Sequence, residues 1–112
     1  MILCLANVLD IETCDRITGL LGASTYESGT RTAGWHARTV KANLQATPDD
    51  NSRQAATLLV EALKRHVVFR AAVMPRAIRP PLFSRYSESM EYGSHVDDPL
   101  MGPPIRCAPT CR

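Results

Sequence analysis

Long hydrophobic runs and a strong excess of one charge are both missing from this 112-residue sequence. The apolar N-terminus, residues 1–9, has no preceding basic residues and meets Asp10 and Glu12 before reaching the length of a signal peptide or membrane span. Acidic and basic residues are interspersed and the formal net charge is +2. The sequence therefore shows no stripe of basic residues of the kind that binds along a phosphate backbone. We therefore expect a cytoplasmic protein that binds neither a membrane nor nucleic acid.

A complete set of cysteine pairs is also missing. Cys4 and Cys14 lie in segments with apolar periodicity, which favours reduced and mostly buried thiols over disulfides. Cys107 and Cys111 have the spacing of metal ligands, but no second cysteine or histidine pair stands near them to complete a zinc tetrahedron. A structural zinc module at Cys107 and Cys111 is therefore a remote alternative.

What is present suits one folded domain, since 45% of the residues are hydrophobic and 21% are charged. Asp10 is a good N-cap for a helix that ends at Gly22, with an apolar face made of Ile11, Cys14, Ile17 and Leu21. Residues 48–51, Pro48-Asp49-Asp50-Asn51, break the pattern and cap a second helix, whose apolar positions are Ala55, Leu58, Leu59, Ala62 and Leu63.

The remaining segments favour strands and loops. Residues 2–9 predict a short buried strand, residues 24–34 a polar loop, and residues 66–69 a β-like segment. Residues 38–45 alternate, which predicts a half-buried strand with Val40, Ala42 and Leu44 on its apolar side. The prolines from Pro75 to Pro81 predict a rigid extended connector. The fold class is α+β, with helices packed against one face of an antiparallel sheet.

The segment that carries chemistry is residues 82–101, which contains His95-Val96-Asp97. In a strand, residues two apart point to the same face, so His95 and Asp97 could both reach one cation. An imidazole and a carboxylate are two thirds of the 2-His-1-carboxylate triad, which holds Fe(II) on one face and leaves positions open. The spacing alone is weak, because a surface histidine beside an acidic turn gives the same pattern.

A longer match strengthens the interpretation. The residues that carry it are Pro80-Pro81-Leu82-Phe83, Arg85-Tyr86, Met90, Tyr92-Gly93, His95-Val96-Asp97 and Pro99-Leu100-Met101, together with Thr32-Ala33-Gly34 and Val40-Lys41-x-Asn43-Leu44-Gln45 upstream. In this order they resemble the PKHD-type hydroxylases, which are Fe(II)/2-oxoglutarate-dependent dioxygenases similar to prolyl 4-hydroxylases. The resemblance covers residues 1–105, as the N-terminal part of one dioxygenase domain, and residues 106–112 do not fit it.

The resemblance implies a fold, cofactors and site residues. His95 and Asp97 would be metal ligands, and Tyr86 would hydrogen-bond 2-oxoglutarate, although a core tyrosine would explain Tyr86 equally well. The fold would be the start of a double-stranded β-helix, or jelly roll. The family couples decarboxylation of 2-oxoglutarate with dioxygen to hydroxylation of a substrate, uses L-ascorbate to keep iron reduced, and suggests a link to iron uptake.

Other polar residues have plainer explanations. Tyr92 and Trp35 are predicted to pack, Gly93 to bend the backbone, and His36 and His66 to lie at the surface or at helix ends. The polar face with Asn43 and Gln45 could line a substrate groove, but solvent exposure explains it just as well, so neither residue joins the predicted site.

The sequence departs from the family pattern at several places. Ser89 stands where glycine is expected, which could alter a turn, and Asp98 stands where asparagine is common, which adds negative charge near the metal ligands. The third ligand, a distal histidine, and a basic partner for 2-oxoglutarate are not in the sequence. We therefore expect a truncated portion that is inactive by itself, and the 106–112 tail suggests a frameshift before Cys107. The alternative is a non-catalytic remnant that acts through weak metal binding or protein contacts.

Overall fold

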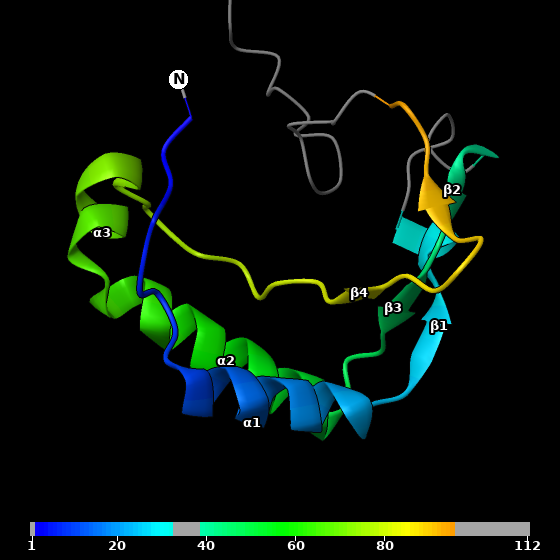
Figure 1. Cartoon of the computed structure of the whole chain (residues 1–112), viewed down its shortest axis with the longest axis horizontal. Helices are drawn as coiled ribbons and strands as arrows, with labels where there is room; N and C mark the ends of the chain where they lie inside the picture. Colours follow the sequence, from blue (N-terminus) through cyan, green and yellow to red (C-terminus); the bar gives the residue numbers. More distant parts are fainter. Residues whose placement is uncertain (1, 33–38, 96–112) are drawn as a thin grey trace, which may run out of the picture.

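The computed structural model describes residues 2–32 and 39–95, which form helices and short antiparallel strands. The elements are α1 (Ile11–Gly22), β1 (Tyr26–Ser28), the 3-10 helix η1 (Gly29–Thr32), β2 (Lys41–Ala42), β3 (Leu44–Ala46), α2 (Asp50–Arg65), α3 (Val67–Val73), β4 (Ser84–Arg85) and β5 (Glu91–Tyr92). Figure 1 shows α1 and α2 side by side, with β1 and β3 at one end of the pair and α3 at the other. The predicted α+β class is confirmed.

Both predicted helices begin at their predicted caps. The Asp10 carboxylate accepts a hydrogen bond from the Thr13 backbone N–H at 2.7 Å, and Asp49 accepts one from the Ser52 N–H at 2.8 Å. Each bond satisfies one of the N–H groups that the first helical turn leaves without a partner. Gly22 is the last residue of α1, as predicted.

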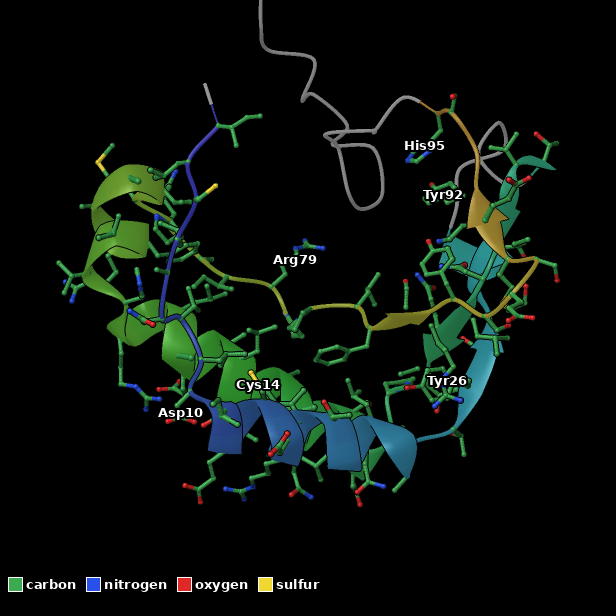
Figure 2. All side chains as sticks on the ribbon, viewed as in Figure 1. Asp10, Cys14, Tyr26, Arg79, Tyr92 and His95 are labelled. Atoms are coloured by element: carbon green, nitrogen blue, oxygen red, sulfur yellow. The ribbon has the colours of Figure 1, made fainter. Side chains whose placement is uncertain are left out.

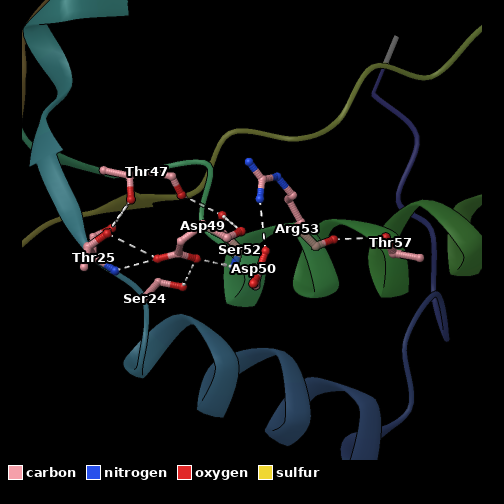
Figure 3. A network of polar contacts seen from close by, with 8 residues as sticks. All are labelled: Ser24, Thr25, Thr47, Asp49, Asp50, Ser52, Arg53 and Thr57. Atoms are coloured by element: carbon pink, nitrogen blue, oxygen red, sulfur yellow. Dashed lines mark hydrogen bonds and ion pairs between the residues drawn. The ribbon is translucent and has the colours of Figure 1, made fainter.

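Asp49 also ties the start of α2 to the chain between α1 and β1 (Figure 3). Its carboxylate accepts the Thr25 backbone N–H at 2.8 Å and the Ser24 hydroxyl at 3.2 Å. The hydrogen bonds from the Ser52 and Thr25 backbones lower the pKa of Asp49 to about 2. An ionised carboxylate therefore fixes where β1 leaves the helix pair.

The core lies between α1 and α2 and is built from small residues. Its buried hydrophobic side chains are Ile17, Ala55, Ala56 and Ala62, and Ala55 is wholly inaccessible. The apolar face predicted for α2 is confirmed. The face predicted for α1 is wrong at its first turns, because Ile11 and Cys14 are exposed.

The prediction of a buried strand at residues 2–9 is wrong. This segment pairs with no strand of the described residues, and Ile2 is 93% exposed. Cys4 is a free thiol but exposed, so its predicted burial is wrong as well. Ala6 instead uses its carbonyl to accept a hydrogen bond from the His66 ring at 2.9 Å. A short apolar run does not specify which element it will contact, and here the contact is with His66 between α2 and α3.

Residues 66–69 form the start of α3 and not the predicted β-like segment. His66 ends α2 and caps α3, because its Nδ1 accepts the Phe69 backbone N–H at 3.1 Å. The cap outweighs the weak β preference of Val67 and Val68. The prediction of His66 as a helix-end histidine is confirmed.

The strands form two small antiparallel sheets, in the orders β1-β3-β4 and β2-β5. The predicted loop over residues 24–34 is wrong in part, because β1 and η1 lie within it. The predicted strand over residues 38–45 is interrupted at Asn43, which separates β2 from β3. The predicted extended connector is confirmed: Figure 1 shows it returning beside α2 from α3 to β4. Among the described residues, no helix is long and apolar enough to cross a membrane.

Candidate functional site

The candidate site lies on a sheet face that the sequence predicted to be exposed. Asn43 and Gln45 are only 5% and 7% accessible, whereas Val40 on the apolar side is 37% accessible. The predicted inner and outer sides of residues 38–45 are therefore reversed in this stretch. Burial of polar side chains costs free energy unless they form hydrogen bonds. A buried polar face therefore points to specific interactions, which an exposed polar face does not require.

Strand pairing sets the neighbours of this face. Lys41 stands opposite Tyr92 in the β2–β5 pair, and Gln45 stands opposite Ser84 in the β3–β4 pair. Directly opposite residues share a face of an antiparallel sheet. Glu27 also stands opposite Gln45, in the β1–β3 pair. The face therefore combines an ammonium, a carboxylate, two amides, a hydroxyl and an aromatic ring. The alternation from Lys41 to Gln45 showed in the sequence that these polar side chains share a face. Alternation alone does not show whether the polar or the apolar face of the strand is buried.

Asn43 holds Tyr86, the residue that follows β4. The Asn43 amide Nδ2 donates to the Tyr86 hydroxyl at 3.1 Å, while its Oδ1 is buried without a hydrogen-bond partner in the described structure. Because the Tyr86 oxygen accepts from Asn43, its own proton can point to another acceptor. Tyr86 is 48% exposed, so it is not the core tyrosine that was the alternative. Its predicted contact with 2-oxoglutarate stays a prediction.

Gly29 makes room for the Asn43 side chain. The Gly29 N–H donates to the Asn43 carbonyl at 2.9 Å, which brings the two backbones together. A β-carbon at position 29 would overlap Asn43 Oδ1 and would lie 2.9 Å from Asn43 Cγ and 3.1 Å from Lys41 Cε. Glycine at this position therefore permits the polar face to close over Asn43.

His95 follows β5 and folds back onto it (Figure 2). Its Nδ1 lies 2.7 Å from the Gly93 carbonyl oxygen, and its ring stacks on Tyr92 with centroids 3.6 Å apart and planes at 9°. The predicted strand through His95 is wrong for the described part, because β5 ends at Tyr92. Asp97 lies outside the described residues, so its predicted role stays a prediction.

Lys41 places a positive charge on this face, which also carries the Glu27 carboxylate. Burial lowers the pKa of its ammonium, and its Nζ lies 5.1 Å from the centroid of the Tyr92 ring. A cation over an aromatic face is attracted by the ring quadrupole. The Tyr92 ring therefore interacts with both the Lys41 ammonium and the His95 imidazole.

The donor set of this region fits a metal of the Fe(II) class, although the described residues contain no group of three histidine, cysteine, aspartate or glutamate side chains that could hold one. A carbonyl oxygen cannot donate, so Nδ1 of His95 carries the proton and Nε2 carries the lone pair that binds metals. His95 is exposed, and Asp97 would add a carboxylate two residues further on. The remote zinc site at Cys107 and Cys111 lies outside the described residues.

Comparison with known proteins identifies hydroxylases. The chain is 41% identical over 105 residues to a PKHD-type hydroxylase of Crocosphaera subtropica, 42% over 103 residues to one of Thermosynechococcus vestitus, and 40% over 104 residues to one of Thioalkalivibrio sulfidiphilus. These alignments cover 91 to 92% of the chain and 46% of each relative. No family model and no solved structure matches the chain.

The chain is thus related to hydroxylases over nearly all of its length. More specifically, it is a homologue of the PKHD-type hydroxylases, as the resemblance of its motifs implied, and it spans about half the length of the curated relatives it matches.

Proposed function

We propose that this chain contributes the first part of the active site of an Fe(II)- and 2-oxoglutarate-dependent dioxygenase. The observation that carries the proposal is His95, whose Nδ1–H is bound to the Gly93 carbonyl so that Nε2 offers its lone pair two residues before Asp97. Relatives named as hydroxylases support the reaction class. His95 and Asp97 would hold iron, with a third ligand from a part of the enzyme that this sequence does not contain.

Each residue of the candidate site has a definite task in this proposal. When bound, Fe(II) would use dioxygen and 2-oxoglutarate to hydroxylate a substrate, with succinate and carbon dioxide as the other products. Tyr86 would donate its hydroxyl proton to a 2-oxoglutarate oxygen, because Asn43 already occupies an acceptor position on that hydroxyl. Lys41 and Asn43 would keep this wall of the site polar.

The architecture of the proposed parent enzyme is a double-stranded β-helix, of which residues 1–105 supply helices and the first strands. The short strands of the two described sheets leave hydrogen-bonding edges that further strands could extend. Because the sequence has neither the distal histidine nor the basic partner, the 112-residue polypeptide alone should not consume 2-oxoglutarate.

The proposal includes L-ascorbate as the reductant of iron, a cytoplasmic location and a link to iron uptake. The hydroxylated substrate is left open.

The test is an anaerobic titration of the chain with Fe(II) and 2-oxoglutarate, monitored by the charge-transfer absorption of a 2-oxo acid chelated to ferrous iron. We expect a protein-dependent band that disappears in His95→Ala and weakens in Tyr86→Phe. The matched control is His66→Asn, which alters a histidine at a helix end and should leave the band unchanged. A band that survives His95→Ala, or no band at any concentration, would overturn the proposal and favour a non-catalytic remnant.

A further inference from the structure

Two contacts that hold the imidazole of His95 come from the residues just before it. The Gly93 carbonyl oxygen lies 2.7 Å from Nδ1, and the Tyr92 ring is parallel to the imidazole within 9° at a centroid distance of 3.6 Å. One contact fixes the direction of the N–H bond and the other fixes the plane of the ring. Together they leave the side chain little freedom to rotate about either of its torsions.

The Gly93 contact selects one tautomer. Since the carbonyl can only accept, the neutral imidazole must be protonated at Nδ1, and Nε2 then carries the lone pair. Without a partner on Nδ1, both tautomers would be populated and part of the population would present an N–H to a cation. The bond therefore prepares Nε2 as a ligand before any metal binds.

The β2–β5 pair fixes Tyr92 and Gly93 in turn. Tyr92 stands opposite Lys41, whose ammonium lies over its ring at 5.1 Å. The Gly93 N–H donates to the Val40 carbonyl at 2.8 Å, and a β-carbon on residue 93 would lie 3.1 Å from Val40 Cβ. Glycine thus allows the close approach of β2 that aims the Gly93 carbonyl back at His95.

We propose that Tyr92 is a positioning residue for His95, and that its ring and the Gly93 carbonyl together hold the imidazole with Nε2 presented to a divalent cation. This inference rests on the proposed function and adds to it a residue that sequence patterns assign to packing alone. Packing alone would make Tyr92 matter for stability, whereas positioning makes it matter for the tautomer and the metal affinity of His95.

The first test reads the tautomer in the metal-free chain, by the nitrogen chemical shifts of the His95 ring in NMR at a pH where it is neutral. In the parent chain and in Tyr92→Phe, which keeps the stacked ring, Nδ1–H should predominate. In Tyr92→Leu the signals should move toward the mixture of an unconstrained histidine. Tyr26→Leu is the control, because Tyr26 is a structural tyrosine whose hydroxyl donates to the Leu21 carbonyl at 2.9 Å. It should lower stability and leave the tautomer unchanged.

The second test titrates the same proteins and His95→Ala with Mn(II), and follows paramagnetic broadening of the backbone amide signals of residues 92–95, which every variant retains. Removal of a group that orients a ligand commonly lowers metal affinity 10- to 100-fold. We expect about a tenfold loss in Tyr92→Leu and less than about twofold in Tyr92→Phe and Tyr26→Leu. An unchanged tautomer and unchanged affinity in folded Tyr92→Leu would refute the positioning role. If His95→Ala binds Mn(II) as the parent does, the proposed metal site fails first, and the two failures are thereby distinguished.

Discussion

Replacing Gly29 with alanine should destabilise the chain chiefly through its contact with the side chain of Asn43. The new β-carbon would overlap Asn43 Oδ1 and lie 2.9 Å from Cγ, and Asn43 is only 5% accessible, so it has little room to move. Insertion of a methyl group into a packed site costs about 1–3 kcal/mol. Loss of the hydrogen bond to Tyr86 would add about 0.5–1.5 kcal/mol if Asn43 turned away.

An opposing effect comes from the unfolded chain. Alanine has less conformational freedom than glycine there, which favours the folded state by about 0.4–1 kcal/mol when the backbone fits. The Gly29 backbone is not in the left-handed region, so alanine meets no dihedral strain. The net loss in the free energy of unfolding should therefore be about 1–3 kcal/mol, with the clash as its dominant cause.

A double-mutant cycle isolates that cause. In the Asn43→Ala background both colliding atoms are gone, and Gly29→Ala should then be neutral or stabilising by up to about 1 kcal/mol. The coupling between the two substitutions should therefore exceed about 1 kcal/mol. Urea unfolding followed by far-UV circular dichroism, with equal slopes in all four proteins, measures it. If Gly29→Ala changes stability equally in both backgrounds, the close contact of Gly29 with Asn43 is refuted.

Three further predictions concern stability. The pKa of Asp49 is lowered to about 2 from an ordinary 3.8, so its ionised carboxylate stabilises the fold above about pH 4. This contribution is lost as the pH falls toward 2. Asp49→Asn should therefore give a flatter acid-unfolding profile in that window. Ala55→Leu, at a wholly buried position of α2, should cost about 1–3 kcal/mol in urea unfolding, whereas Gln54→Leu on its exposed side should change stability by less than about 0.5 kcal/mol. Ser89→Gly should raise the unfolding free energy by up to about 1 kcal/mol, because Ser89 has φ 68°, which costs a residue with a β-carbon about 1–2 kcal/mol; an unchanged midpoint would argue against that conformation.

Local chemistry predicted the helices well. Asp10 and Asp49 cap α1 and α2 with their own side chains, three residues from the N–H groups they satisfy, so the signal and its partner lie in one stretch of sequence. The same reasoning did not predict α3, because its cap is His66, and a histidine there performs the capping that serine or aspartate usually performs. It failed at residues 2–9 because an apolar run does not specify what will cover it.

The candidate site depended on information that no single segment contains. An amide in an alternating strand gives the same pattern whether it faces solvent or the interior, so Asn43 could not be assigned without Gly29 on one side and Tyr86 on the other. His95 and Tyr86 were found by the resemblance of their motifs to a family. The stacking of Tyr92 on His95 depends on a backbone that turns back after β5, and sequence spacing does not predict that turn.

The break at Asn43 and the turn at Ser89 are two parts of one arrangement. Arg85 stands opposite Leu44, so an uninterrupted partner strand would bring Glu88 opposite Lys41, but Tyr92 stands there instead. Residues 87–90 are therefore looped out, and the Met90 N–H closes the loop onto the Ser87 carbonyl at 3.0 Å. The positive φ of Ser89 falls inside this loop, at the position where the family resemblance led us to expect glycine. The loop thus lets one edge of residues 41–45 contact Tyr86 through Asn43 and Tyr92 through Lys41, and His95 stacks on Tyr92. The two halves of the proposed site therefore share this segment as their common support, although Asn43 divides it into β2 and β3.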